Sequence, residues 1–340
     1  MKLNLPPVQQ TNIYNVYIQA RASAALAVAV RIGLFETLAQ EAKTATMIAT
    51  HHNLHIRGAK AILRALSACA ILHHEDSYYH LTEEAKTYLL KEAPFYLGAL
   101  IDMENESFLT PQKLLASAQS GQPSVYGDED VWETHEHDST KARSFTAAMH
   151  AISTEPALAL ADLTIWTQCA KLLDVGGGSG VLSIAIAQRH PIEAQIYDIQ
   201  QVCSIAKEYI DQYQLSERIT TITGDMFTDA FPIGHDAVLF SQILHDWNPQ
   251  QGKELLKKAT KSLPQGGWII IHEKLTNPND QHKPIANALV NLDMLIWTEG
   301  QQYSASELEK LLADCGCIHI QTRNTIGYWS ATIGYYPKPD

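Results

Sequence analysis

The chain has 340 residues, more than a domain with a single hydrophobic core usually contains, so we expect one large domain and a smaller partner domain. Hydrophobic residues make up 46% and charged residues 18%, a globular composition that excludes a disordered chain. The formal net charge of -12 argues against nucleic acid as a partner, because proteins that bind it gather Lys and Arg against phosphates.

Local patterns exclude further classes of protein. No apolar run reaches the roughly 20 residues that cross a bilayer, and residues 1–10 lack the layout of a signal sequence, so we expect a cytoplasmic protein without a membrane partner. The five cysteines form no CxxC pair, which fits a reducing compartment. The histidines within residues 51–55 and 135–137 lack further ligands at a metal-binding spacing, so we interpret them as solvated loop residues and expect no metal.

The N-terminal part of the sequence reads as helices followed by a hairpin. Residues 17–38 carry an Ala-rich apolar pattern, and residues 57–69 place apolar side chains on one helix face. In residues 70–81, a turn around Asp76 and Ser77 separates two short strand-like runs, and Thr82 is placed to cap the next helix. This order of elements predicts a winged-helix domain.

A winged helix has two functional interpretations. DNA binding needs a basic recognition helix, but residues 57–66 carry few cations in an acidic chain. Burial against a second subunit needs apolar surface, and the nearly uncharged helix of residues 20–34 has more of it than one small domain requires. We therefore prefer dimerisation.

Further along the chain, a helical stretch over residues 92–120 and a loop rich in Gly, Pro and Asp over residues 121–130 precede an alternation of strands and helices. The predicted strands are residues 171–175, 194–198, 219–223, 237–240 and 268–272. Such alternation predicts a parallel sheet with helices on both faces. Residues 318–322 and 329–335 are joined by too few residues for a crossover helix, so these two strands should pair antiparallel at the end of the sheet.

The first of these strands runs through LLDVGGGSG, residues 172–180, directly into a helix at residues 181–189. Glycines there allow a sharp turn and a close ligand, and the helix N-terminus favours a negative group. A dinucleotide fingerprint would place a small residue at position 181, which is Val181. A carboxylate instead precedes the glycines, in the spacing Asp174, Gly176, Gly178 and Gly180. This arrangement suits a cationic or hydroxyl-bearing ligand and not a pyrophosphate.

Carboxylates also end the next two strands. Asp198 can accept two hydrogen bonds from a ribose diol. Asp225 offers an acceptor for an adenine amino group, and Met226, followed by Phe227, offers a soft apolar surface for the ring. Because the carboxyl ends of neighbouring parallel strands meet at one edge of a sheet, these groups predict a single ligand site.

The runs LLDVGGGSG, YD at residues 197–198, GDMF at residues 224–227 and LHDW at residues 244–247 resemble the motifs of the SAM-dependent O-methyltransferases, the family of plant phenolic, hydroxyindole and bacterial aromatic enzymes. The runs GLFETLA and LRALSACAIL extend the resemblance over nearly the whole chain. The resemblance implies S-adenosyl-L-methionine (SAM) as the cofactor, a role in secondary metabolism, and a homodimer joined by interlocked winged-helix domains.

The resemblance also implies an α/β architecture. We expect a Rossmann-like class I methyltransferase domain, with a mostly parallel seven-stranded sheet and an antiparallel last strand, and an N-terminal winged-helix dimerisation domain that is all-helical apart from its hairpin. The expected division is a dimerisation domain at residues 1–105, a helical linker contributing to the substrate pocket at residues 106–165, and the SAM-binding catalytic domain at residues 166–340.

The predicted cofactor contacts are Asp174, Gly176, Gly178, Asp198, Asp225, Met226, Phe227 and Ser241. Of these, the resemblance carries over Gly176, Asp198, Asp225 and Met226. At Ser241, many plant members of the family have a lysine four residues before the catalytic histidine. A hydroxyl can still bond the cofactor there, but the positive charge is lost.

Methyl transfer to an oxygen requires that the acceptor lose its proton. A phenol has a pKa near ~10 and a histidine near ~6.5, so a positioned imidazole can take that proton. His245 follows the fourth strand at the same sheet edge, and Glu273 ends the next strand, where it can orient the ring as in a catalytic triad. His272 should point to the other face, because neighbours on a strand alternate. Glu273 also matches the family's carboxylate partner.

The family's second glutamate is replaced here by Gln302, whose amide can hold the ring but cannot balance its charge. We expect the acceptor pocket to use Phe145 and Met149, together with Asn291 and Met294 of a helix at residues 285–297. The sequence thus predicts O-methylation of a small aromatic molecule. Two alternatives stay open: another reaction with the same cofactor, such as N-methylation, decarboxylation or hydroxylation, and a ligand-sensing winged-helix regulator.

Overall fold

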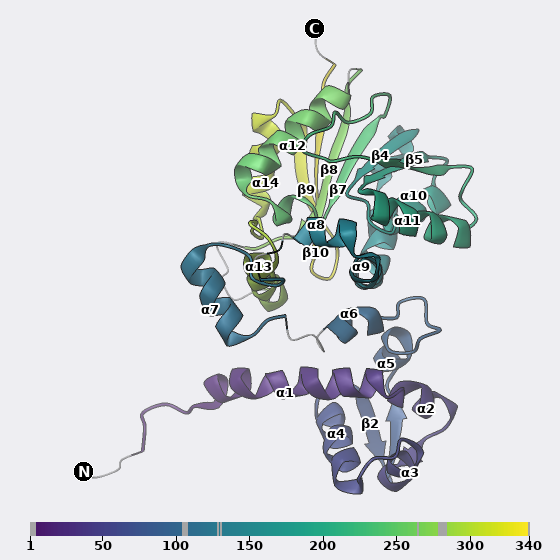
Figure 1. Cartoon of the computed structure of the whole chain (residues 1–340), viewed down its shortest axis with the longest axis vertical. Helices are drawn as coiled ribbons and strands as arrows, with labels where there is room; N and C mark the ends of the chain where they lie inside the picture. The colour runs from purple at the N-terminus through teal and green to yellow at the C-terminus, as the bar shows by residue number, and fades with distance from the viewer. Residues whose placement is uncertain are drawn as a thin grey trace. The chain divides into compact units, whose positions relative to one another are not determined.

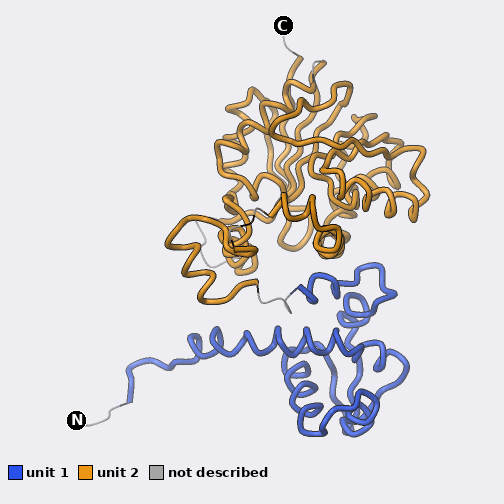
Figure 2. Tube along the Cα trace, in the orientation of Figure 1, with its two compact units in different colours: residues 1–107 blue, residues 108–340 orange. Residues whose placement is uncertain are grey.

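Two compact units make up the chain, residues 1–107 and residues 108–340 (Figure 2). The computed structural model describes residues 5–103, 108–127, 129, 131–263, 265–277 and 284–338. Each unit has its own hydrophobic core. The finer division that separates a linker at residues 106–165 stays a prediction.

Unit 1 is mainly helical around a small sheet (Figure 1). Its elements are α1 (Thr11–Arg31), α2 (Leu34–Gln40), β1 (Lys43–Thr44), α3 (Ala45–His51), α4 (Ile56–Ala68), β2 (Leu72–Glu75), β3 (Tyr78–Leu81), α5 (Glu83–Tyr88) and α6 (Gly98–Met103). The predicted hairpin is confirmed, because β2 and β3 pair antiparallel and the turn residues Asp76 and Ser77 have φ of 47° and 73°. Thr82 caps α5 as expected, its hydroxyl accepting from Ala85 N at 3.2 Å. The short strand β1 pairs with β3, so the sheet has three strands.

The apolar segment of residues 17–38 forms two helices and not one. α1 ends at Arg31 and α2 begins at Leu34, with Gly33 between them at φ 72°. Any other residue would be strained at that left-handed φ, so Gly33 allows the chain to change direction. Both helices contribute to the core of unit 1, through Val30 and Leu34 among others.

Unit 2 is a three-layered α/β structure (Figure 1). Its helices are α7 (Pro111–Ser120), α8 (Val131–His137), α9 (Ser139–Ala161), α10 (Val181–Arg189), α11 (Gln200–Gln212), α12 (Pro249–Ser262), α13 (Ile285–Trp297) and α14 (Ala305–Asp314), with 3-10 turns η2 (Thr164–Gln168) and η3 (Leu244–Asp246). Its strands are β4 (Lys171–Val175), β5 (Glu193–Asp198), β6 (Ile219–Thr223), β7 (Ala237–Ser241), β8 (Gly267–Lys274), β9 (Ile318–Ile326) and β10 (Trp329–Tyr336).

The seven strands of unit 2 form one sheet in the order β6-β5-β4-β7-β8-β10-β9. The five strands predicted to be parallel do pair in parallel. β10 pairs antiparallel with both β8 and β9, which confirms the expected arrangement of the last two strands. The helical stretch predicted over residues 92–120 is interrupted: α6 and α7 occupy parts of it, and residues 104–107 lie outside the described residues.

Each face of this sheet has its own core, because successive strand residues point to opposite sides. On β4, Leu172 belongs to the cluster beneath α9, α10 and α11, whereas Leu173 belongs to the cluster beneath α12 and α14. Helices therefore cover both faces, and the edge where the parallel strands end is left to bind a ligand.

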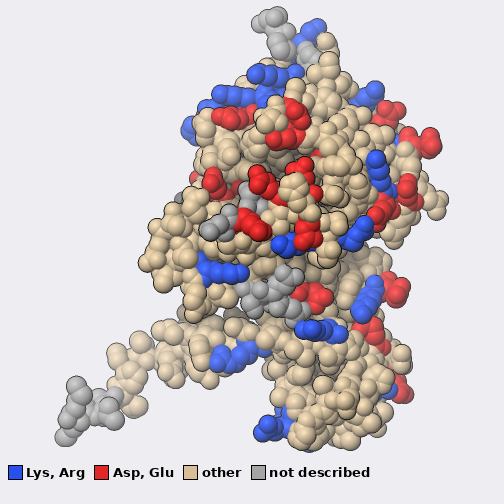
Figure 3. Space-filling view, in the orientation of Figure 1, with Lys and Arg blue, Asp and Glu red and all other residues tan. Residues whose placement is uncertain are grey.

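The surface agrees with an acidic chain of mixed charge. On the face shown in Figure 3, Lys and Arg lie in small separate groups among Asp and Glu. Among the described residues, no single helix has both the length and the apolar composition to cross a membrane; α1 and α2 reach them only as a pair, across a 64° bend.

Candidate active site

The glycine turn, residues 176–180, joins β4 to α10 at the carboxyl edge of the sheet. Gly176, Gly178 and Gly180 have φ of 65°, 58° and 77°, left-handed values that strain other residues. A Cβ on Gly176 would lie 2.3 Å from Cδ1 of Ile243, so the segment after β7 closes this side of the turn. A Cβ on Gly178 would meet nothing within 4 Å. The backbone is therefore open to a ligand at Gly178.

Two of the predicted carboxylates hold this turn. Asp174 is 1% exposed, and it accepts a hydrogen bond from Ser183 Oγ in α10 at 2.7 Å. Asp198, at the end of β5, accepts from Gly178 N at 2.9 Å and from Ile199 N at 2.8 Å. Burial raises the pKa of Asp174 and of Asp198 to about 6, so both are mainly ionised at neutral pH. Asp174 thus lies behind the turn, while Asp198 is only partly buried and has lone pairs left for a ribose hydroxyl.

The segment after β6 lies against the same turn. The methyl group of Met226 is 3.6 Å from the Cβ position on Gly176. Asp225 is exposed, and its carboxylate accepts from Phe227 N at 2.7 Å. Lys258 of α12 donates to the carbonyls of Met226 and Phe227 at 2.7 and 2.8 Å, which anchors the segment. The structure therefore brings these predicted residues to one edge with the glycine turn.

Ser241 ends β7 and faces β8. Its hydroxyl lies 3.2 Å from Nδ1 of His272, whose ring is fully buried and stacks on Trp329 at 5.0 Å. Burial lowers the pKa of His272 to about 3, so its imidazole is neutral. The next residue on β8, Glu273, contacts the main chain of His245 and not Ser241. This difference from His272 is expected, because neighbouring side chains on a strand point to opposite faces.

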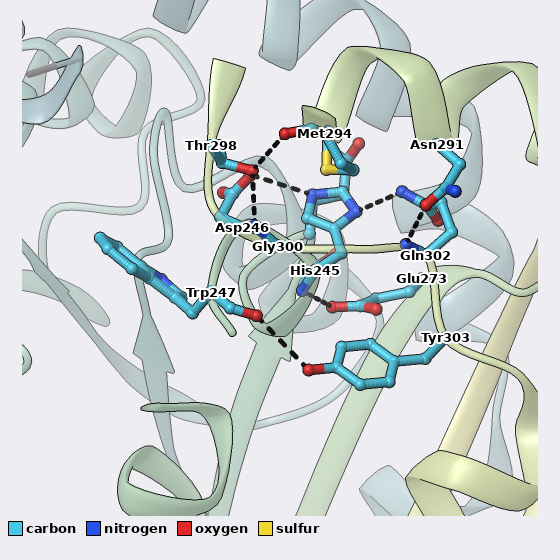
Figure 4. A network of polar contacts seen from close by, with 12 residues as sticks. His245, Asp246, Trp247, Glu273, Asn291, Met294, Thr298, Gly300, Gln302 and Tyr303 are labelled. Atoms are coloured by element: carbon cyan, nitrogen blue, oxygen red, sulfur yellow. Dashed lines mark hydrogen bonds and ion pairs between the residues drawn. The ribbon is translucent and has the colours of Figure 1, made fainter. Parts of the chain in front are cut away.

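His245 lies in η3, which follows β7 after Gln242 and Ile243, and it is 6% exposed. The amide nitrogen of Gln302 lies 2.9 Å from His245 Nδ1, and a carboxylate oxygen of Asp246 lies 3.6 Å from Nε2 (Figure 4). Gln302 is itself held, because its backbone N donates to Oδ1 of Asn291 at 2.8 Å. Burial, with a smaller effect of Lys274, lowers the pKa of His245 to about 3. The ring is therefore neutral at physiological pH.

Glu273 lies next to His245 but does not hold its ring. One carboxylate oxygen accepts from the main-chain N of His245 at 3.1 Å (Figure 4). The other is buried and has no hydrogen-bond partner among the described residues. Burial raises the pKa of Glu273 to about 8 and raises that of Asp246 as well. The ring contact expected of Glu273 is made by Gln302, because the free N–H groups at the start of η3 point at the carboxylate instead.

Aromatic side chains gather beside η3. Trp247 follows it directly, with the ring of Phe227 at 4.5 Å and that of Trp132 from α8 at 6.0 Å. Phe145 of α9 lies 6.0 Å from Trp132 and 5.8 Å from Trp297 at the end of α13. We call these five residues the aromatic cluster. It places the predicted pocket residue Phe145 among rings from four other segments of unit 2.

The other predicted pocket residues have separate positions. Met294 of α13 is 8% exposed and lies beside the ring of His245 (Figure 4). Asn291 holds Gln302, and Met149 is partly buried on α9. His135 is 2% exposed on α8, which corrects its interpretation as a solvated loop residue. Among the described ranges, no group of three or more His, Cys, Asp or Glu side chains is arranged to hold a metal.

Sequence reasoning missed Asp246, Lys258 and the three tryptophans of the aromatic cluster. Asp246 had a local signal, because it directly follows His245. Trp247 also had one, because it ends the LHDW run. Trp132 and Trp297 had none, because they belong to α8 and α13, which are far apart in the chain.

Solved structures share the fold of this chain. Human N-acetylserotonin methyltransferase in complex with SAM has a TM-score of 0.86 at 22% sequence identity, covering 98% of this chain and 100% of that one. PigF with SAH, the demethylated product of SAM, has a TM-score of 0.82 at 25% identity, covering 96% of this chain and 99% of that one. The fold is that of the Rossmann-like class I methyltransferases.

Sequence comparisons give the family. A model of the O-methyltransferase domain matches residues 113–317, and a model of the O-methyltransferase dimerisation domain matches residues 16–91. The 3-hydroxy-5-methyl-1-naphthoate 3-O-methyltransferase of Streptomyces sahachiroi is 32% identical over 302 residues, which cover 87% of this chain and 86% of that protein. This chain belongs to the O-methyltransferase family, and it is a SAM-dependent methyltransferase.

Proposed function

We propose that the protein methylates a hydroxyl of a small aromatic molecule and that His245 takes the hydroxyl proton. The observation that carries this proposal is the buried, neutral imidazole of His245. It lies at the same edge of the sheet as the glycine turn, because the two segments follow the neighbouring strands β7 and β4. A neutral imidazole keeps a lone pair for the proton, whereas a protonated ring has none.

We assign the cofactor to the glycine turn, Asp198 and the segment of residues 225–227. Bound SAM supplies an electrophilic methyl group. The residues present fit such a ligand, because the turn is open at Gly178 and the carboxylate beside it is ionised. Asp225 offers a further acceptor, and Met226 an apolar surface. Ser241 and Asp174 border this site, and we keep them as predicted contacts.

Proton transfer to Nε2 of His245 requires that Nδ1 carry a hydrogen. The carbonyl oxygen of Gln302 is buried without a partner among the described residues, and its amide nitrogen is the atom next to Nδ1. A half-turn of the amide places the carbonyl against Nδ1–H, which leaves the Nε2 lone pair available. We therefore propose that Gln302 selects the tautomer and that Glu273 positions the ring through the main chain of η3.

The aromatic cluster supports an aromatic acceptor. Its rings and Met294 line the region around η3 with flat, polarisable surfaces, which favour a planar ring over a flexible chain. The relative from Streptomyces sahachiroi is named for a hydroxyl on a naphthoate ring, which is consistent with this class of acceptor. We assign Phe145, Met149, Asn291, Met294 and Gln302 to the acceptor side of the site.

We also propose a homodimer formed through unit 1. The match to the dimerisation domain covers residues 16–91 and so includes most of α1. Near the start of α1, Ile13, Val16 and Tyr17 are 77%, 68% and 60% exposed and lie on one side of the helix. An exposed apolar stripe of this kind is typical of a subunit interface.

The decisive experiment compares wild type with His245→Ala. Both are incubated with SAM and a panel of phenols, hydroxynaphthoates and aromatic amines, and SAH formation is measured. Removal of a general base should lower kcat by about 10²- to 10⁴-fold. Isothermal titration with SAH should give the same Kd for both proteins.

His73→Ala is the matched control, because His73 lies on β2 in unit 1 and its side chain is exposed. It should retain wild-type kcat. If His245→Ala also retained wild-type kcat, the assignment of the base would be wrong, and methylation of the amines alone would favour N-methylation over O-methylation.

A further inference from the structure

α9 contacts the glycine turn, to which we assign the cofactor, and the loop after β7, which leads to His245. Nδ1 of His150 lies 2.8 Å from the hydroxyl of Ser179 in the glycine turn. Almost one turn later, the hydroxyl of Ser153 accepts a hydrogen bond from Nε2 of Gln242 at 2.9 Å, and Gln242 directly follows β7. We call these four residues the α9 bridge. It ties one helix to the loops after β4 and β7.

The histidine of the α9 bridge is held on both sides. Its ring stacks on Tyr209 of α11 at 4.2 Å with an interplanar angle of 19°. Ser179, its hydrogen-bond partner, is 4% exposed. Burial lowers the pKa of His150 to about 4, so the contact stays a hydrogen bond between neutral groups across the physiological range.

Gln242 reaches α9 from a strained backbone. Its φ is 55°, a left-handed value that is uncommon for a residue other than glycine. Its backbone N donates to the carbonyl of His272 at 3.1 Å, and its side chain donates to Ser153. Strain of this kind persists only where surrounding contacts compensate for it, and it often marks a functional position.

The same helix carries residues assigned to the acceptor side. Met149 directly precedes His150, and Phe145 lies just over one turn earlier within the aromatic cluster. The two hydrogen bonds of the α9 bridge therefore connect the loops after β4 and β7 to the helix that carries Phe145 and Met149.

We propose that the α9 bridge couples cofactor binding to formation of the acceptor pocket, so that the acceptor binds more tightly when the cofactor is bound. This inference rests on the proposed function, because it needs the cofactor at the glycine turn. Two sites that bias the same element share a coupling free energy, which acts equally in both directions. His150 and Ser153 are then positioning residues for the acceptor and have no part in the proton transfer.

The test needs no acceptor. Hydrogen exchange of the full-length protein is followed by mass spectrometry, with and without SAH, in peptides from residues 139–161. In wild type, SAH should slow exchange in α9 by about fivefold or more. In His150→Phe with Ser153→Ala, SAH should still bind, but the slowing in α9 should be lost while that in the glycine turn remains. Phenylalanine keeps a ring to stack on Tyr209 and removes only the hydrogen bond.

His190→Phe is the matched control. Nε2 of His190 lies 2.8 Å from the carbonyl of Ala161, the last residue of the same helix, and its other hydrogen bonds among the described residues go to Ile186 and Arg218. This variant should keep the full slowing by SAH. Ser153→Ala alone provides a milder variant, in which the slowing should be reduced.

The outcomes separate the two proposals. If SAH gave no binding heat with wild type, the cofactor assignment in the proposed function would fail. If SAH bound but left exchange in α9 unchanged, or if the double variant kept the wild-type slowing, the α9 bridge would not be the connection and the inference would be overturned.

Discussion

Gln302 is the side chain next to Nδ1 of His245, so its charge affects how readily the ring accepts a proton. The hydrogen bond of the neutral amide, at 2.9 Å from Nδ1, offsets only part of the effect of burial, which keeps the pKa of His245 at about 3. The imidazole is thus a weak resting base that binds a proton only while the acceptor oxygen attacks. Titration of His245 should therefore cause no loss of enzyme activity as the pH drops from 8 to 5.

Gln302→Glu tests this view. A carboxylate at the same position should stabilise the imidazolium and raise the pKa of His245, by about 1–3 units for a close opposite charge. Because the neutral ring is the active form, the acid limb of kcat against pH should move to higher pH by a similar amount. An acid limb that stayed in place would mean that the residue at 302 does not control the charge of the ring.

Glu273 gives a prediction about stability. Burial raises its pKa to about 8, so between pH 4.5 and 8 the folded protein keeps a proton that the unfolded chain releases. The stability that this group contributes is present below pH 4.5 and is lost as the pH rises through 8. Glu273→Gln removes this dependence, so its Tm should improve relative to wild type between pH 5 and pH 8. The check is the difference in Tm at the two pH values, and a constant difference would contradict it.

At the scale of elements, two glycines of the glycine turn differ in the space around them: Gly176 is packed against a side chain, and Gly178 is not. Gly176→Ala would place a methyl group 2.3 Å from Ile243, whereas Gly178→Ala would place it in open space. Both variants carry the strain of a positive φ, which costs about 1 kcal/mol. We expect Gly176→Ala to lower Tm more than Gly178→Ala does. Gly178→Ala should instead raise the Kd for SAH, because its methyl group occupies the proposed ligand side. Equal Kd values for Gly178→Ala and wild type would place the cofactor elsewhere.

The sequence predicted the elements best where one local pattern determines both ends. β4, β6, α10 and α13 begin and end at the predicted residues, because apolar runs there are bounded by glycines, prolines or a change of periodicity. The break at Gly33 was missed, since a single glycine within an Ala-rich apolar segment does not interrupt its helical pattern. The interruption between α6 and α7 was missed for a similar reason.

The same reasoning explains which parts of the site were predictable. Asp198 ends a parallel strand, and Met226 and His245 come shortly after the ends of two others. The rule that such strand ends share an edge brings these residues together without knowledge of side-chain packing. The contact of Gln302 with His245 was expected only from the family resemblance. The partners of His150 and Trp132 depend on how α8 and α9 pack on the sheet, and sequence periodicity does not specify helix packing.

For the whole molecule, the apolar stripe at the start of α1 predicts the oligomeric state. Ile13→Glu places a charge in the proposed interface, and burying an unpaired charge is costly. The variant should therefore shift the protein from dimer to monomer in light scattering coupled to size-exclusion chromatography. Ile233→Glu is the control, because Ile233 is 71% exposed in unit 2, close to the 77% of Ile13. A dimer that persisted in Ile13→Glu would show that this stripe is not essential to the interface.

Three of the six tryptophans belong to the aromatic cluster. The protein consequently contains its own fluorescent probe. When Trp132, Trp247 and Trp297 are excited with ultraviolet light, a ring compound that stacks near them should quench their fluorescence emission. Titrating unlabelled compounds into the protein and following native emission would then rank acceptors before any turnover is measured.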